Sequence, residues 1–382
     1  MEKNQYNYST NKGYIEYLDY CRAFGAFVII MLHSGIDSVQ NFFIFALPMF
    51  FVLSGFVYDP DKQTKRDYIK GRFKRLVIPF WGVTAMYMIV EADRSAVLGY
   101  GTLHNLITFP VYMIYGSSIL PPVTGISEII AKYSYPYSMA FGRVYIASPS
   151  ANHLWFLPAL FTGSIMFCIL EEKTRKSILS KMIAIVFLLA IAYFDSSIAL
   201  IKQLPWGIGT GAFGAACMLC GYWVRKNRVL EKDVKILIPS VVIGLLLAVL
   251  AEYLGSTGGA MISSYYGPRG VWSVCLTFAG GLGGAWFVIC LMKGLYESPI
   301  KRLKRGLALV GKASMQIYEY QMLLLFVFGY LFLMISGTTP QLDVWLLGFV
   351  PLTPATIVFL VAESLAIVVS ITWWQIRQSG LR

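Results

Sequence analysis

The chain has 382 residues, of which 57% are hydrophobic and only 14% are charged. Its mean hydropathy of +0.62 excludes a soluble globular protein and is typical of a chain that crosses a membrane many times. A formal net charge of +12 is also common among nucleic-acid-binding proteins, but the positions of the basic residues favour membrane topology, and we expect no nucleic-acid partner.

Long apolar runs predict about ten membrane-spanning helices, so we expect an all-α, polytopic integral membrane protein. The predicted spans are 18–35, 41–58, 76–92, 153–170, 182–194, 207–223, 236–254, 270–292, 314–335 and 355–374. We expect the first span to be retained, because no small-residue cleavage site follows a short apolar core near the N-terminus. Residues 1–382 are expected to form a single transmembrane domain in the lipid bilayer.

Basic residues are distributed unevenly over the segments between these spans. With the N-terminus in the cytoplasm, all but five of the 32 Lys and Arg residues fall in or beside inward-facing segments. The five exceptions are Arg94, Lys132, Arg143, Lys202 and Arg269. Cytoplasmic loops of membrane proteins show this excess of Lys and Arg. The distribution predicts that both termini are cytoplasmic, and it accounts for the net charge.

The first predicted span carries polar residues that a membrane helix seldom contains. Asp19 and Arg22 lie near its inner end, and His33 lies near its outer end. Arg22 and His33 are eleven residues, or about three helical turns, apart, so they share one face about 16 Å apart along the axis. Such groups are costly in a membrane and indicate chemistry or transport. Hydrogen bonding to a neighbouring helix is the simpler alternative for His33.

The most basic stretch, 59–75, follows the second span and leads into the third. Within it, Arg72 and Arg75 are three residues apart and are expected to face the same way on a helix. Guanidinium groups suit the binding of phosphates, and they equally suit anchoring to lipid headgroups, so both roles stay open. Ser54 and Gly55 end the second span and are best explained by close helix packing, with a nucleophilic role for Ser54 disfavoured.

The longest outward segment, 93–152, has an apolar middle that predicts a re-entrant or interfacial piece. A single crossing is disfavoured because it would reverse the charge asymmetry of the later loops, whereas two crossings stay open. His104 lies within this segment, and His153 directly follows it, close to Trp155. The simplest role for His153 is that of an interfacial anchor.

Two carboxylates, Glu319 and Glu363, fall inside the last two predicted spans. A charged carboxylate at mid-bilayer costs roughly 2.5 to 3.5 kcal/mol on insertion scales, so we expect a partner or a polar cavity. Pairing with an arginine and a catalytic role are equally open. The six cysteines are Cys21, Cys168, Cys217, Cys220, Cys275 and Cys290. We expect them to act as small hydrophobic residues, with neither a disulfide nor a metal site.

Four motifs occur in order along the chain: Arg22 and His33 separated by ten residues and preceded by Leu18-Asp19; PMFFVLSGF at 48–56; Arg72 and Arg75 followed by IPFW at 78–81; and HLWFLP at 153–158. The fourth is the weakest. Together they resemble the acyltransferase family 3 membrane proteins, which transfer acyl groups, usually acetyl, to sugars of bacterial surface glycans. The likeness covers essentially the whole chain.

The resemblance implies a membrane O-acetyltransferase of the bacterial cytoplasmic membrane that uses acetyl-CoA from the cytoplasm as its acyl donor. It implies that His33 acts as general base on a hydroxyl of a glycan or lipid-linked sugar, or briefly carries the acyl group itself. Arg72 and Arg75, together with Arg22, would bind the phosphates of the acyl-CoA. Asp19 would position Arg22 rather than react.

The chain departs from the family near the start of the ninth span. Members often have Tyr-x-x-His there, whereas this chain reads Tyr318-Glu319-Tyr320-Gln321. Glutamine forms hydrogen bonds but cannot supply a proton, so Glu319 is the candidate substitute. We also expect no esterase-like outer domain of the kind some members carry, so the acyl group would pass directly to the acceptor or to a separate partner protein.

Other classes of membrane protein fit the sequence less well. The main alternative is a transporter or flippase for a lipid-linked sugar, in which the same charges would line a path, but no internal repeat is evident. A membrane-bound O-acyltransferase of the unrelated multi-helix class is disfavoured because the candidate histidine lies in the first span. A purely structural protein is least favoured, since nothing structural requires a base and a cation on one face.

Overall fold

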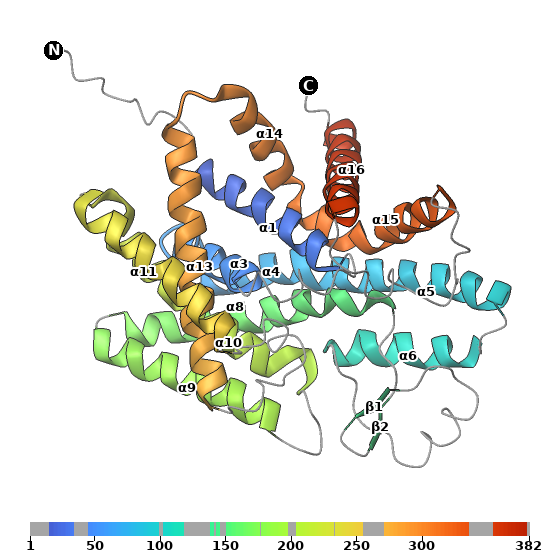
Figure 1. The fold of residues 1–382 in the computed structure, drawn as a ribbon. Helices are drawn as coiled ribbons and strands as arrows, with labels where there is room; N and C mark the ends of the chain where they lie inside the picture. The colour runs from blue at the N-terminus through green and yellow to red at the C-terminus, as the bar shows by residue number, and fades with distance from the viewer. Residues whose placement is uncertain are drawn as a thin grey trace.

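The computed structural model consists mainly of α-helices (Figure 1). It describes residues 15–33, 45–98, 102–117, 138–140, 143–145, 150–175, 177–197, 204–232, 234–254, 271–335 and 354–379. The α-helices are α1 (Tyr17–His33), α3 (Ala46–Phe56), α4 (Lys65–Arg72), α5 (Ile78–Leu98), α6 (Thr102–Tyr115), α8 (Phe156–Thr174), α9 (Ile178–Ser197), α10 (Ile208–Lys226), α11 (Val234–Tyr253), α13 (Val271–Glu297), α14 (Lys301–Lys312), α15 (Ser314–Ile335) and α16 (Pro354–Ser379). The shorter elements are a π-helix at Phe73–Val77, 3₁₀ turns at Ser150–Trp155, Pro205–Gly207 and Val229–Glu231, and the strands β1 (Ser138–Ala140) and β2 (Arg143–Tyr145).

The expected helical, membrane-spanning character of the chain is confirmed. Among the residues that the structure describes, five helices are long and apolar enough to cross a membrane: Lys65–Val90, His153–Thr174, Ile178–Asp195, Pro205–Lys226 and Val271–Glu297. Each overlaps one predicted span. Two shorter apolar helices, Ala46–Phe56 and Leu237–Ala251, fall within two further predicted spans. The count of ten spans and the cytoplasmic placement of both termini stay predictions.

Within the long segment 93–152 the structure differs from the all-α expectation. β1 and β2 pair antiparallel in a short hairpin, with Met139 opposite Val144. The same segment contains α6, whose 14 residues extend only about 21 Å, less than the roughly 30 Å hydrocarbon core. α6 packs on α5, where the indole of Trp81 donates to the carbonyl of Met113 at 3.1 Å. The re-entrant placement of this segment stays a prediction.

α4 and α5 form one rod through the π-helix, whereas the sequence predicted a span that begins only at residue 76. At the end of the π-helix the backbone N–H of Ile78 donates to the carbonyl of Phe73, five residues earlier. Pro79 follows directly, and in a regular α-helix its ring would clash with the carbonyl four residues before it. The wider turn relieves this clash, so the rod continues through the proline.

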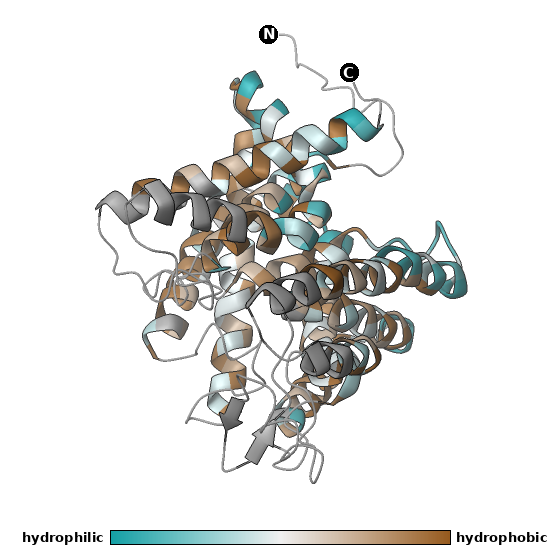
Figure 2. Cartoon of the chain, turned by 90° about the vertical axis from the view of Figure 1, so that its right-hand side faces the viewer, coloured by the Kyte–Doolittle hydropathy of each residue, from teal (hydrophilic) through white to brown (hydrophobic). Residues whose placement is uncertain are grey.

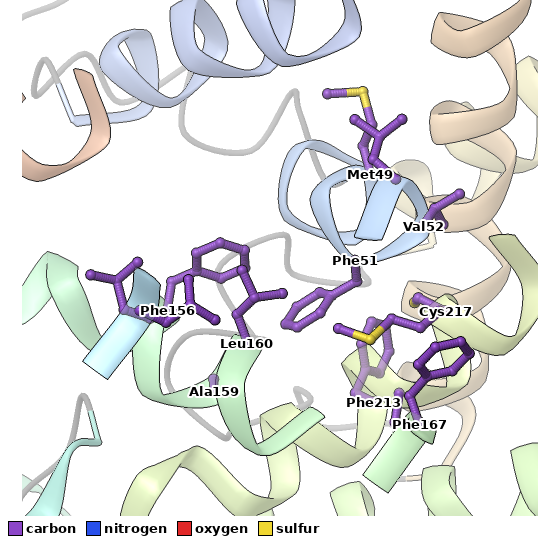
Figure 3. Close-up of a cluster of buried hydrophobic side chains, with 14 of the residues drawn as sticks. Met49, Phe51, Val52, Phe156, Ala159, Leu160, Phe167, Phe213 and Cys217 are labelled. Carbon is purple, nitrogen blue, oxygen red and sulfur yellow. The ribbon is translucent and has the colours of Figure 1, made fainter. Parts of the chain in front are cut away.

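α10 lies at the centre of the helical core, in contact with α3, α8 and α9. Phe51 of α3 lies over Gly214 of α10 and packs edge-on against Phe156, with 5.1 Å between ring centroids (Figure 3). Gly55 of α3 and Gly221 of α10 lie where a Cβ would overlap the backbone of the other helix. Small residues let membrane helices approach closely, so the packing role expected for Gly55 is confirmed.

The outer faces of several helices are apolar. Val186 and Phe187 of α9, Leu246 of α11 and Trp272 of α13 are each more than half exposed. Figure 2 shows apolar residues along the lengths of the helices and hydrophilic residues toward the ends of several of them. Apolar surface of this extent is unfavourable in water and favourable against lipid tails. The chain is therefore a membrane protein.

Candidate active site

An ion pair joins two of the three polar residues of α1. The side chain of Asp19 is 2% exposed, and its Oδ1 lies 2.5 Å from Nη1 of Arg22. A carboxylate buried to this degree requires a charged or hydrogen-bonding partner, because desolvation of an unpaired charge is costly. Arg22 keeps 31% of its side chain exposed. The pair thus orients the guanidinium and leaves part of it accessible.

α14 packs across α1 at this ion pair. A Cβ on Gly311 would overlap the backbone of Asp19, so the approach of the two helices requires glycine. α14 is not among the predicted helices, because its charged residues interrupt any long apolar run. Leu303, Leu307 and Val310 recur at helical spacing and were the signal that could have revealed an amphipathic helix.

His33 is the last residue of α1 and is only partly buried. Its Nδ1 lies 2.7 Å from the backbone carbonyl of Ile29, one turn earlier. Because a carbonyl oxygen only accepts hydrogen bonds, Nδ1 carries the proton and donates it to this contact. Nε2 then holds the lone pair. The ring is therefore in the tautomer that can take up a proton at the nitrogen facing away from its own helix.

A second imidazole lies beside His33. His153 belongs to the 3₁₀ turn before α8, is 7% exposed, and packs edge-to-face on His33 with 6.3 Å between ring centroids. The interfacial-anchor role that we favoured for His153 does not match this burial. The contact between these two histidines could not be predicted from the sequence, because they are 120 residues apart. In the sequence, only the weak HLWFLP motif indicated that His153 belongs to the site.

Two tyrosines and the backbone of α15 hold His153 in place. Tyr318 donates its hydroxyl hydrogen to the backbone carbonyl of His153. The Nε2 of His153 lies 3.4 Å from the carbonyl of Glu319, which also accepts from the hydroxyl of Tyr87 at 3.2 Å. The ring of Tyr87 packs against His153 at 5.2 Å. α5, α15 and the turn before α8 therefore meet around one imidazole.

The two unusual polar residues of α15 are both buried here. Glu319 is 6% exposed and Gln321 is fully buried. Within the described part of the chain, neither the oxygen nor the nitrogen of the Gln321 amide has a hydrogen-bond partner. Buried amides are rarely left in this state, because each unmade bond costs about 1–3 kcal/mol. The amide is thus available to a polar group that enters the site.

The predicted phosphate-binding arginines gather near the other end of α1. Arg72 donates through Nε to the hydroxyl of Tyr68 at 3.2 Å, and its guanidinium carbon lies 5.2 Å from the centroid of that ring. Arg75 is exposed and bonds the carbonyl of Gly71. The positive charges of Arg72 and Arg22 both act on Arg75. Among the described residues, Arg72 and Arg75 form no ion pair.

The structure thus groups the candidate residues in two places along α1. His33, with His153, lies at its C-terminal end, and Arg22 lies eleven residues earlier with the other arginines, about 16 Å away along the axis. A polar channel between the two groups stays a prediction. Glu363 lies in α16 and His104 in α6, but their side chains fall outside the described part of the structure.

A family model for an acyltransferase domain of type 3 matches residues 15–371, which is essentially the whole chain and includes every candidate residue described above. No curated protein and no solved structure matches the chain.

Proposed function

The chain belongs to acyltransferase family 3. We propose that it transfers an acyl group, most simply acetyl, from acyl-CoA to a hydroxyl group of a cell-surface or exported glycan. Acetyl-CoA is the proposed donor, and the acceptor is a glycan or a lipid-linked sugar. The proposed location is the cytoplasmic membrane of a bacterium, with the donor entering from the cytoplasm. Family membership together with the apolar helices supports a membrane acyltransferase.

The proposal rests on the two ends of α1. At one end lies His33, whose imidazole can accept a proton, and near the other lies Arg22, which is grouped with Arg72 and Arg75. The 3′-phosphate and diphosphate of CoA are polyanionic, and arginine is well suited to bind them. With these phosphates bound at Arg22, Arg72 and Arg75, the flexible pantetheine arm extends along α1 toward His33. Asp19 holds Arg22 through its ion pair.

The proposed reaction is a direct acyl transfer. Nε2 of His33 accepts the proton of the acceptor hydroxyl while the oxygen attacks the thioester carbonyl. The carbon–sulfur bond then breaks, and the CoA thiolate takes up the proton from His33. A two-step variant, in which Nε2 first carries the acyl group, uses the same atoms in the same place. His153 packs on His33 and restricts the orientations of its ring.

The decisive experiment uses the purified protein in liposomes with acetyl-CoA labelled in the acetyl group. We expect label on an added glycan or lipid-linked sugar, together with an equal amount of free CoA. Movement of the lipid-linked sugar across the bilayer without acylation would contradict the proposal and indicate a transporter. Mass spectrometry of surface glycans from cells with and without the gene would then identify the acceptor.

A further inference from the structure

An apolar cavity of about 320 Å³ lies among α3, α9, α10 and α13. It shares no lining residue with the two groups along α1. Its walls include Met182 and Ile185 of α9, Trp223 of α10, and Trp286 and Ile289 of α13. Almost all of the lining is hydrocarbon or aromatic ring, so the cavity excludes a polar ligand and suits an alkyl chain.

The cavity opens on a lipid-facing surface. Ile178 and Met182, two of its lining residues, are 65% and 60% exposed. The same outer face of α9 continues through Val186 and Phe187, which are also more than half exposed. An alkyl chain of a surrounding lipid can therefore enter from the side without crossing water.

Positive charge lies at one end of the cavity. Lys181 is the one charged residue in its lining, and Lys226, at the C-terminal end of α10, acts electrostatically on it. The carboxylate that acts on Lys181 is that of Glu171, but both of its oxygens accept hydrogen bonds from Arg175 at 3.0 Å. In the described part of the chain, neither lysine forms an ion pair.

We propose that this cavity binds an anionic phospholipid, with one acyl chain in the cavity and the phosphate between Lys181 and Lys226. The apolar walls recognise the chain, and the two ammonium groups recognise the negative headgroup. Both lysines lie on the side that the charge distribution predicts to be cytoplasmic, where anionic lipids are available. Ordinary anchoring of lysines to headgroups would need no cavity beside them.

The test is native mass spectrometry of the purified full-length protein with phosphatidylglycerol or phosphatidylcholine of identical acyl chains. We expect one phosphatidylglycerol to be retained at a clearly lower concentration than phosphatidylcholine. Lys181→Gln should weaken retention of phosphatidylglycerol roughly fivefold and leave phosphatidylcholine unchanged, because one charge near a headgroup is worth about that factor. Lys173→Gln removes the same charge at an exposed position of α8 outside the cavity and is the matched control.

A second variant tests the acyl chain. Ile185→Trp fills the cavity and should reduce retention of both lipids equally. Equal retention of the two lipids by the wild type, or equal effects of Lys181→Gln and Lys173→Gln, would overturn the proposal. So would one-for-one displacement of phosphatidylglycerol by a long-chain acyl-CoA, which would make the cavity part of a donor site. None of these measurements depends on acyl transfer, so they remain informative if the proposed function fails.

Discussion

Tyr318 donates its hydroxyl hydrogen to the backbone carbonyl of His153, which ties α15 to the turn that carries the second imidazole. Removal of the hydroxyl in Tyr318→Phe should cost about 1 kcal/mol of stability, because it leaves a buried carbonyl with one bond fewer. We also expect a several-fold lower kcat with an unchanged KM for acetyl-CoA, since His153 packs on His33. Tyr320→Phe, two residues along the same helix, is the control. Equal kinetics of the two variants would remove Tyr318 from the positioning of His153.

His33→Ala should reduce acyl transfer by about 10²- to 10⁴-fold, the usual contribution of a general base. CoA release by the purified protein measures the rate, and thermal unfolding in detergent shows whether the fold is intact. His33 is only partly buried at the end of α1, so we expect little loss of stability. Turnover near the wild-type rate would exclude His33 from the chemistry.

Arg72→Ala should weaken acetyl-CoA binding, measured by calorimetry, on the order of tenfold or more, because a charged hydrogen-bonding partner of phosphate is lost. Arg72→Lys keeps the charge but loses the planar fork, so an intermediate affinity is expected. Lys74→Ala removes one charge from an exposed position in the adjoining π-helix and serves as the control. If Lys74→Ala weakens binding as much as Arg72→Ala, the effect comes from the general positive charge of this region and not from a specific contact of Arg72 with a phosphate.

Gly311→Ala should destabilise the protein by about 1–3 kcal/mol, since the added methyl group overlaps the backbone of Asp19 and must push α14 away from α1. Gly306 lies in the same helix with no atom within 4 Å of an added Cβ. Gly306→Ala should therefore be neutral or slightly stabilising. Thermal unfolding of the two variants tests this difference. Equal stability would show that α14 can move away from α1 without loss of stability.

The Gln321→Met variant tests whether the amide of Gln321 takes part in the reaction or only affects stability. Methionine has a similar volume and removes two buried polar atoms that lack partners within the described part of the chain, so stability should be unchanged or higher. If the amide binds the acceptor or the thioester, the rate of acyl transfer should fall at the same time. A stable variant with wild-type turnover would show that Gln321 has no part in the reaction.

The apolar pattern predicted the central helices closely. The predicted span 207–223 corresponds to the helix Ile208–Lys226, and the predicted span 270–292 corresponds to Val271–Glu297. In both cases the helix extends further at its C-terminal end, because basic and polar residues continue the hydrogen-bonded backbone beyond the apolar run. α14 was not predicted, because the apolar residues of an amphipathic helix lie on one face and are separated along the sequence by polar residues, so they form no apolar run.

The site was only partly predictable. The pairing of Asp19 with Arg22 follows from helical spacing, because residues three apart on a helix are neighbours. The meeting of His33 with His153, and of His153 with Tyr318, depends on which helices pack together, and single-sequence periodicity holds no information on that. The chemistry of the residues therefore identified His33 as a candidate. Its contact with His153, and that of His153 with Tyr318, became known only from the tertiary structure.

The π-helix at Phe73–Val77 holds one residue more than an α-helical register requires. If these five residues were wound as an ordinary α-helix instead, the chain before them would turn by about 100° relative to α5. Tyr68 would leave the ring of Tyr58, 4.9 Å away between centroids, and Arg72 would swing with it. The direction in which the Arg72 guanidinium points therefore depends on the winding of the backbone at Phe73–Val77 as well as on its contacts with Tyr68.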